Sequence, residues 1–294
     1  LGVRWLSSRL MEPRLHILGA GTMGAGLAHC AAIAGMNSVL VDLAEPALER
    51  ALKNIARDDR LLRLTGRRAT PGDIPPHDRI KTTVDIGHLR DAQFVFECLP
   101  EKIPVKEPMY ALMDALCPAE TIFASVTSAI PIAVIGGWTG RPDRIVGAHF
   151  MNPPQWKDTA EVVRCRETSD ETWDAMMGVL ERLGKKAIPV PDGPGFIINR
   201  LLMPAINDAA ELMETQRCGA AKVDRLFRDC LGHRSGPLET ADLIGVDTVV
   251  DTLEVLRSCL EDQRFTPSPV LLNMVASGRL GKKSGRGFYD YEEC

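Results

Sequence analysis

The sequence predicts an α/β protein in which a doubly wound parallel sheet is followed by a smaller all-α domain. From Arg14 to about Val190, short apolar segments typical of strands alternate with longer segments whose apolar residues recur at helical spacing. Strands separated by helices pair in parallel, and the helices cover both faces of the sheet. Beyond Val190 only helical patterns follow. We therefore expect the second domain to contain helices alone.

The length of the chain fits two domains. At about 150 residues per domain, 294 residues give about two, and the apolar content of 45% is sufficient for ordinary cores. The Pro- and Gly-rich segment that begins at Pro189 marks the boundary. We expect an extension or cloning remnant over 1–12, with Met11 as the natural start, an α/β domain over 13–190 and a helical domain over 191–294.

Each expected element is a short periodic segment that ends at turn residues. The strands of the first domain are expected at 15–18, 38–41, 94–97, 121–124 and 145–148, with a further strand-like segment at 161–163. Helical spacing follows the first strand up to Gly35 and returns over 45–64, before a loop over 65–78. The second domain is expected to form helices over 196–217, 220–231, 242–261 and 270–276.

Composition and charge exclude several classes of function. A formal net charge of −4 gives no overall cationic field for nucleic acid. The apolar stretch 27–41 is interrupted by Gly35, Asn37 and Ser38 and is too short to span a membrane. The eight cysteines are scattered, without a C-x-x-C pair or zinc-type spacing. We expect a soluble cytoplasmic protein with reduced thiols and no metal site.

A glycine-rich turn after the first strand predicts a dinucleotide site. The pattern G-x-G-x-x-G is weak alone, but here it follows a strand and begins a helix, as in Rossmann-type domains. Asp42 ends the next strand, where a carboxylate accepts hydrogen bonds from ribose hydroxyls and repels a 2′-phosphate. No Arg follows it closely, so the pattern favours NAD over NADP. The expected contacts of this turn are Gly19, Ala20, Gly21, Thr22, Met23 and Gly24.

One histidine of the six follows a predicted strand directly. His149 comes after the strand 145–148, and strand ends of a doubly wound sheet face the ligand crevice. Glu161 begins the next strand-like segment and could return to His149 across a hairpin-like loop. A histidine paired with a carboxylate has a fixed tautomer and a stabilised cationic form, which suits a general base.

Several motifs together resemble the 3-hydroxyacyl-CoA dehydrogenase family over nearly the whole chain, from about Pro13 to Tyr291. They are GAGTMGAG (19–26), ECLPE (97–101), ASVTS (124–128), HFMNPP (149–154), PGFIINR (194–200), GPLE (236–239) and GKKSGRGFY (281–289). The resemblance implies an NAD-dependent oxidoreductase of fatty acid metabolism. It would interconvert a 3-hydroxyacyl thioester and the 3-ketoacyl thioester, and would act as a homodimer that associates through the helical domain.

The resemblance also implies roles for individual residues. His149 would be the catalytic base with Glu161 as its partner, and Ser128 and Asn199 would hydrogen-bond the reacting oxygen of the substrate. The residues that match family positions near the nicotinamide or its ribose are Glu101, Lys106, Ser128, Asn152 and Lys283. Because Asn199 belongs to the second domain, we expect the substrate to lie in the cleft between the domains.

The chain departs from the family pattern where relatives meet the substrate. Val126 replaces a common Asn, and Asp58 and Thr65 stand where a small hydroxyl residue and a Lys usually meet CoA. A carboxylate repels phosphate, although Arg67 and the adjacent Arg68 could restore positive charge. Acyl carrier protein is therefore an alternative to CoA as the carrier of the thioester. A free hydroxy acid, as in the gulonate dehydrogenase branch, and a catalytically silent NAD-binding or structural protein are further alternatives.

Overall fold

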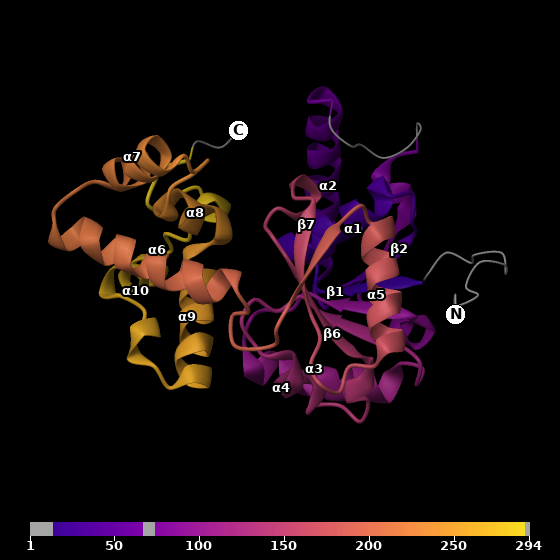
Figure 1. Cartoon of the computed structure of the whole chain (residues 1–294). Helices are drawn as coiled ribbons and strands as arrows, with labels where there is room; N and C mark the ends of the chain where they lie inside the picture. The colour runs from indigo at the N-terminus through magenta and orange to yellow at the C-terminus, as the bar shows by residue number, and fades with distance from the viewer. Residues whose placement is uncertain (1–13, 67–73, 292–294) are drawn as a thin grey trace.

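The computed structural model describes residues 14–66 and 74–291, and these form a sheet domain with a helical domain at its side (Figure 1). Arg67 and Arg68, the expected source of positive charge for the substrate phosphate, and the expected extension over 1–12 fall outside the described residues. No helix in the described part is long and apolar enough to cross a membrane.

The sheet of the first domain has eight strands in the order β3-β2-β1-β4-β5-β6-β7-β8. Their bounds are Leu15–Leu18 (β1), Ser38–Val41 (β2), Ile80–Thr83 (β3), Phe94–Glu97 (β4), Ile122–Ser125 (β5), Ile145–Phe150 (β6), Thr159–Val163 (β7) and Lys186–Val190 (β8). All neighbouring strands run parallel except β6 and β7, which are antiparallel. The predicted doubly wound α/β class is confirmed, and the chain order reverses between β1 and β4, where such sheets bind ligands.

The strands that the sequence did not predict lie at the two edges of the sheet. β3 carries Lys81, Thr82 and Thr83, and β8 exposes Lys186 and Ile188. Edge strands are half solvated and so lack the continuous apolar run by which buried parallel strands are recognised. The hairpin-like return expected between His149 and Glu161 is present at β7, because the short loop between β6 and β7 permits only an antiparallel return.

Helices cover both faces of the sheet. The helices of the first domain are Thr22–Ile33 (α1), Glu45–Leu64 (α2), Ile103–Leu116 (α3), Ile132–Gly136 (α4) and Asp170–Arg182 (α5). Side chains from α1, α2 and α5 form one core with alternate residues of the strands, and α3 and α4 join the core on the other face. Alternation along the strands thus divides the apolar residues between two layers.

The second domain is helical, as predicted. Its helices are Ile198–Thr215 (α6), Ala220–Leu231 (α7), Pro237–Ile244 (α8), Val246–Leu260 (α9) and Pro269–Ala276 (α10). The predicted single helix over 242–261 is wrong, because Gly245 adopts a φ of 105° that separates α8 from α9. The helix expected to begin at Phe196 begins two residues later, because the φ of 50° at Phe196 is not helical.

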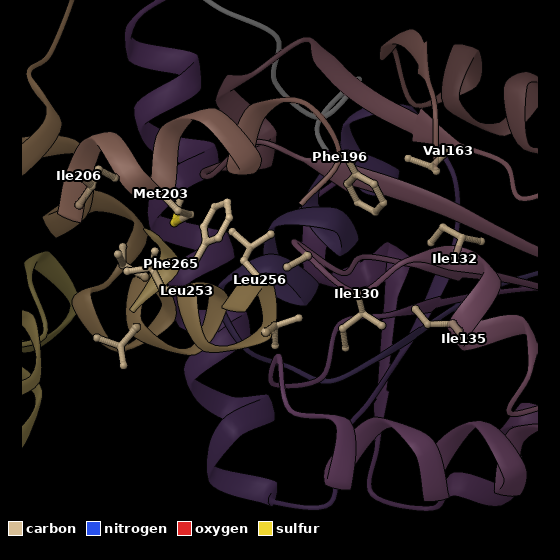
Figure 2. Close-up of a cluster of buried hydrophobic side chains, with 14 of the residues drawn as sticks. Ile130, Ile132, Ile135, Val163, Phe196, Met203, Ile206, Leu253, Leu256 and Phe265 are labelled. Atoms are coloured by element: carbon tan, nitrogen blue, oxygen red, sulfur yellow. The ribbon is translucent and has the colours of Figure 1, made fainter. Parts of the chain in front are cut away.

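One apolar core continues from the sheet into the helical domain. Figure 2 shows Ile130 and Ile132 of the first domain near Phe196 of the linker and Leu256 of α9, and all four are buried in the same cluster. Burial of each such side chain contributes about 1.5–3 kcal/mol relative to exposure. This shared core fixes the start of α6 against the carboxyl ends of the strands.

Candidate active site

The glycine turn has the geometry that a bound pyrophosphate requires. Gly19 has a φ of 100°, and a Cβ at Gly24 would lie 1.8 Å from the carbonyl oxygen of Gly19, so neither position accepts a side chain. A Cβ at Gly21 would meet nothing within 4 Å, so the backbone faces open space at the N-terminus of α1. Backbone N–H groups and the positive end of the helix dipole together favour an anion at this point.

Asp42 connects the end of β2 to the same turn. Its Oδ2 accepts a hydrogen bond from the Ala20 amide at 2.7 Å, and its Oδ1 accepts one from the Ala44 amide at 2.9 Å. A carboxylate offers about four acceptor positions, so further positions stay available for ribose hydroxyls. These two bonds orient the carboxylate toward the glycine turn.

His149 and Glu161 face each other across the antiparallel strands β6 and β7. They are paired residues in the strand register, and His149 Nδ1 lies 2.7 Å from Glu161 Oε2. Both residues are buried, with exposed fractions of 5% and 4%. An Nδ1–H that donates to the carboxylate leaves Nε2 as the nitrogen able to accept a proton.

The second oxygen of Glu161 binds the beginning of α6. Oε1 accepts hydrogen bonds from the amides of Ile197 and Ile198 at 3.2 and 3.1 Å, which are otherwise unsatisfied donors of a helix N-terminus. Burial alone would raise the pKa of Glu161, but the hydrogen bond and charge of His149, together with the two amides, lower it. Glu161 therefore stays ionised and joins the two domains at the site.

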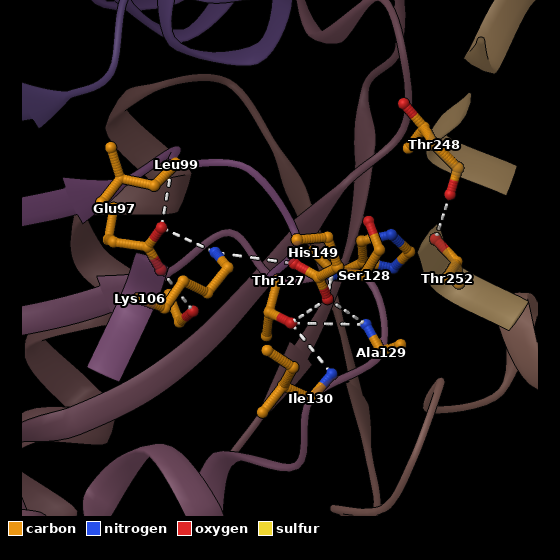
Figure 3. A network of polar contacts seen from close by, with 12 residues as sticks. Glu97, Leu99, Lys106, Thr127, Ser128, Ala129, Ile130, His149, Thr248 and Thr252 are labelled. Atoms are coloured by element: carbon orange, nitrogen blue, oxygen red, sulfur yellow. Dashed lines mark hydrogen bonds and ion pairs between the residues drawn. The ribbon is translucent and has the colours of Figure 1, made fainter. Parts of the chain in front are cut away.

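Asn199 of α6 brings Ser128 and His149 together. Its Nδ2 donates to the carbonyl oxygen of Ser128 at 2.8 Å and lies 3.4 Å from His149 Nε2. Ser128 follows β5, His149 lies near the carboxyl end of β6, and Asn199 comes from the second domain. The structure thus collects the four predicted catalytic residues in one place, with His149 and Ser128 drawn close together in Figure 3.

Glu101 shapes the loop that carries Ser128. Its Oε1 accepts hydrogen bonds from the Thr127 hydroxyl at 2.5 Å and from the amides of Ser128 and Ala129 at 2.9 and 2.8 Å. The Thr127 hydroxyl in turn accepts a bond from the Ile130 amide at 3.0 Å. Sequence reasoning missed Thr127, although it lies inside the motif ASVTS.

Lys106, predicted as a cofactor contact, lies inside the protein. Its Nζ is 2.6 Å from Glu97 Oε1 and 3.5 Å from Glu101 Oε2, and its side chain is 0% exposed. Burial disfavours the charged ammonium, but the carboxylates of Glu97 and Glu101 outweigh this effect and raise the pKa of Lys106. Lys106 is thus an internal counter-charge in this structure. Glu97 was not singled out from the sequence, because only the fold brings these residues together.

The remaining predicted cofactor residues are Asn152, which bonds across to the helical domain, and Lys283, which belongs to that domain. Asn152 Nδ2 donates to the carbonyl oxygen of Leu243 in α8 at 3.0 Å, while its buried Oδ1 has no hydrogen-bond partner among the described residues. Lys283 Nζ lies 2.6 Å from Asp247 of α9. A buried oxygen without a donor suits an amide or hydroxyl of a bound ligand. The glycine turn, Asp42 and Asn152 therefore fit a dinucleotide.

The departures from the family pattern have defined partners. Asp58 of α2 accepts hydrogen bonds from Gln155 Nε2 at 2.7 Å and from Arg57 at 3.2 Å. The Thr65 hydroxyl donates to the carbonyl oxygen of Leu61 at 3.0 Å. Val126 is buried beside the site, with 8% of its surface exposed. None of these three residues forms a hydrogen bond with the four proposed catalytic residues in the part of the chain described.

Comparisons with known proteins give matches over nearly the whole chain. Residues 14–193 match the family model "3-hydroxyacyl-CoA dehydrogenase, NAD binding domain", and residues 195–291 match the model of the C-terminal domain. A probable 3-hydroxybutyryl-CoA dehydrogenase of Bacillus subtilis is 40% identical over 95% of this chain and 98% of its own length. A 3-hydroxybutyryl-CoA dehydrogenase of Bradyrhizobium diazoefficiens is 35% identical over 95% of each chain.

A solved structure is similar over the same extent. The (S)-3-hydroxybutyryl-CoA dehydrogenase of Ralstonia eutropha superposes with a TM-score of 0.81 at 34% identity, covering 96% of this chain and 100% of that one. A diketoreductase structure has a TM-score of 0.75 at 26% identity, covering 95% of this chain and 99% of that one.

Proposed function

The chain belongs to the 3-hydroxyacyl-CoA dehydrogenase family, and we propose that it transfers a hydride between NAD and the hydroxyl-bearing carbon of a 3-hydroxyacyl thioester. The observation that carries this proposal is the buried His149–Glu161 pair, which is joined through Asn199 to Ser128. When bound, NAD accepts the hydride. All other steps belong to side chains of this protein.

His149 acts as the general base in this proposal. With Nδ1–H donating to Glu161, its Nε2 takes the proton of the substrate hydroxyl as hydride leaves the same carbon. Glu161 holds the required tautomer and stabilises the imidazolium that forms. Its lowered pKa keeps it ionised for this task at neutral pH. In the reverse direction His149 returns the proton to the oxygen.

Ser128 and Asn199 stabilise the reacting oxygen. The Ser128 hydroxyl and the Asn199 amide donate to this oxygen as it becomes a carbonyl, or an alkoxide in the reverse direction. Asn199 is already oriented by its bond to the Ser128 carbonyl oxygen. We place the thioester in the cleft beside them, because α6 brings Asn199 from the second domain to the edge of the sheet.

The cofactor would be held along the edge of the sheet. Gly19 to Gly24 would bind the pyrophosphate and Asp42 the adenosine ribose, while Glu101, Asn152 and Lys283 would meet the nicotinamide half. Lys106 would not touch the cofactor and would act through its contact with Glu101. We also propose a homodimer formed through the helical domain and a cytoplasmic location.

CoA is the proposed carrier of the thioester, by analogy with the relatives. Asp58 favours the alternative of an acyl carrier protein, because its carboxylate stands on α2, where the family resemblance places the CoA nucleotide. The bond from Gln155 and the contact with Arg57 each offset part of this charge. Substrate comparison decides between the carriers.

The test is NADH oxidation with acetoacetyl-CoA, with the same acyl group on a carrier protein and with free acetoacetate. We expect turnover with acetoacetyl-CoA that falls by on the order of 10³-fold in His149→Ala. His77→Ala, which changes an exposed histidine, is the matched control and should keep full activity. Turnover of the carrier-protein substrate alone would identify acyl carrier protein, and not CoA, as the carrier. Absence of turnover with every substrate would refute the proposed activity.

A further inference from the structure

We propose that Glu97 sets the balance between the affinities of the site for oxidised and reduced nicotinamide. It does so through a buried net negative charge that Glu97, Glu101 and Lys106 form together. The inference rests on the proposed function only in taking NAD as the ligand. It concerns binding and does not depend on which thioester the protein uses.

The three groups carry two negative charges and one positive charge. Glu97 accepts four hydrogen bonds, from the Leu99 amide at 2.8 Å, Lys106 Nζ at 2.6 Å, and the hydroxyls of Tyr110 and Ser125 at 3.0 Å each. A carboxylate that only accepts bonds is ionised. Glu101 accepts three bonds from the Ser128 loop and also lies 3.5 Å from Lys106. The sum is one negative charge.

This charge is shielded from water. Glu97 and Lys106 are each 0% exposed, and the Glu101 side chain is 8% exposed. Tyr110 supplies a neutral donor, because burial and the adjacent Glu97 raise its pKa well above the usual value. The described residues contain no second cation in contact with Glu97 or Glu101. A buried charge of this kind is screened far less than a surface charge.

The network lies under the expected position of the nicotinamide. Glu97 ends β4, the Ser128 loop follows β5, and Figure 3 shows the chain of contacts that joins them. In the sheet order, β4 and β5 lie between β1, whose turn would bind the pyrophosphate, and β6, which carries His149. A dinucleotide with its ribose on Asp42 and its reactive carbon beside His149 must cross the ends of these two strands.

The oxidised nicotinamide ring is positively charged and the reduced ring is neutral. A nearby negative charge therefore stabilises the oxidised form selectively and leaves the reduced form little changed. At an effective dielectric of about 20, a unit charge about 12 Å away changes a binding constant by on the order of tenfold. The expected effect is a change in the ratio of two dissociation constants.

The experiment measures the dissociation constants of NAD+ and NADH by titration calorimetry, without substrate. In Glu97→Gln the network is neutral, and we expect the affinity for NAD+ to fall about tenfold relative to that for NADH. Glu101→Gln should shift the ratio in the same direction, so the test survives if one variant does not fold. Tyr110→Phe removes a bond to the same carboxylate without changing charge, and it should leave the ratio unchanged.

A compensating double variant separates charge from structural damage. Glu97→Gln with Lys106→Met removes the buried ion pair but leaves Glu101 ionised, so the net charge is again negative and the ratio should return to within about twofold of the original. Equal losses of affinity for NAD+ and NADH in all variants would overturn the inference. So would a double variant whose ratio of dissociation constants is no closer to the original than that of Glu97→Gln. Failure of the protein to bind any dinucleotide would refute the proposed function instead.

Discussion

Buried carboxylates occur in both domains, and their partners differ. In the sheet domain Glu97 and Glu161 contact Lys106 and His149, which are themselves ionisable. In the helical domain Asp224 and Asp242 are equally buried, at 0% and 1% exposure. They accept hydrogen bonds from backbone amides and tyrosine hydroxyls. The donors to Asp224 belong to Leu238, Glu239 and Tyr289, and the donors to Asp242 belong to Phe288, Tyr289 and Tyr291.

This difference shows that burial and hydrogen bonding do not by themselves mark a functional carboxylate. The aspartates satisfy the N-terminus of α8 and hold the end of the chain near Tyr289 against the helical domain. Their partners carry no charge at neutral pH, so no proton moves between them. A glutamate beside an imidazole can instead change the protonation of its partner during a reaction. Substitutions in the two domains should therefore affect different quantities.

The largest expected effect is on catalysis, in Glu161→Gln. The amide can accept from His149 through one oxygen but cannot stabilise the imidazolium, so kcat should fall by on the order of 10³-fold. The melting temperature should fall by about 2–4 °C at neutral pH, because Gln keeps the size of Glu161 but has one acceptor oxygen in place of two for His149 and the helix amides. Steady-state kinetics and thermal unfolding check the two effects. A kcat within tenfold of the original would remove Glu161 from the mechanism and erase the contrast with the aspartates.

The next effect is on stability, in Asp224→Ala. The change leaves the amides of Leu238 and Glu239 and the Tyr289 hydroxyl without their acceptor, which costs about 2–4 kcal/mol of unfolding free energy. Denaturant unfolding measures this loss. The kcat of the folded fraction should stay within about twofold of the original. A selective loss of kcat without loss of stability would show that the helical domain acts on the reaction directly.

A smaller effect is the pH dependence of stability, which distinguishes Glu161 from Asp242. The pKa of Glu161 is lowered in the folded protein, so its stabilising contribution is present above the unfolded value of about 4.3 and is lost as the pH falls through the lower folded pKa. The pKa of Asp242 is raised, chiefly by burial, so its ionisation costs stability as the pH rises above about 3.9.

The two signs predict opposite trends in matched variants. The stability difference between the original protein and Glu161→Gln should grow from pH 3 to pH 7. The penalty of Asp242→Asn should shrink over the same range, because the asparagine avoids the cost of ionisation. Denaturant unfolding at both pH values measures the differences. Parallel trends would mean that the environments of the two carboxylates are alike.

The smallest effect concerns Asp58, a carboxylate that is neither catalytic nor structural in this comparison. Its side chain is 18% exposed, so its repulsion of a CoA phosphate is weakened by solvent. Asp58→Ser should lower the KM for acetoacetyl-CoA by about threefold and leave kcat unchanged. The same variant should not alter the KM for a pantetheine thioester that lacks the nucleotide. An unchanged KM for CoA would place the nucleotide away from Asp58.

Sequence reasoning worked best where the signal is local. The buried strands β1, β2, β4, β5 and β6 are short apolar runs, and the class of fold follows from their alternation with helices. The edge strands β3 and β8 were missed because half-solvated strands lack that run. The break at Gly245 was missed because a glycine inside a helical pattern ends a helix only in certain surroundings.

The candidate site divides in the same way. His149 and Glu161 could be paired from the sequence, because each lies next to the end of a predicted strand and a short loop joins the two strands. The contact of Lys106 with Glu97 could not be predicted, since it depends on how α3 packs against β4. The role of the Ile197 and Ile198 amides likewise requires the position of α6 on the sheet.

The sequence by itself determined the glycine turn, the alternation of buried strands with helices, and the residues able to carry a proton or a phosphate, because these depend on local sterics and side-chain chemistry. Apart from the His149–Glu161 pair, only the tertiary structure decided the partners of the buried charges. Partners such as Glu97 and Lys106, or Asp224 and Tyr289, meet through packing between elements. The physical reason is that the free energy of a buried charge depends on all the groups around it, and those groups come together only when the chain has folded.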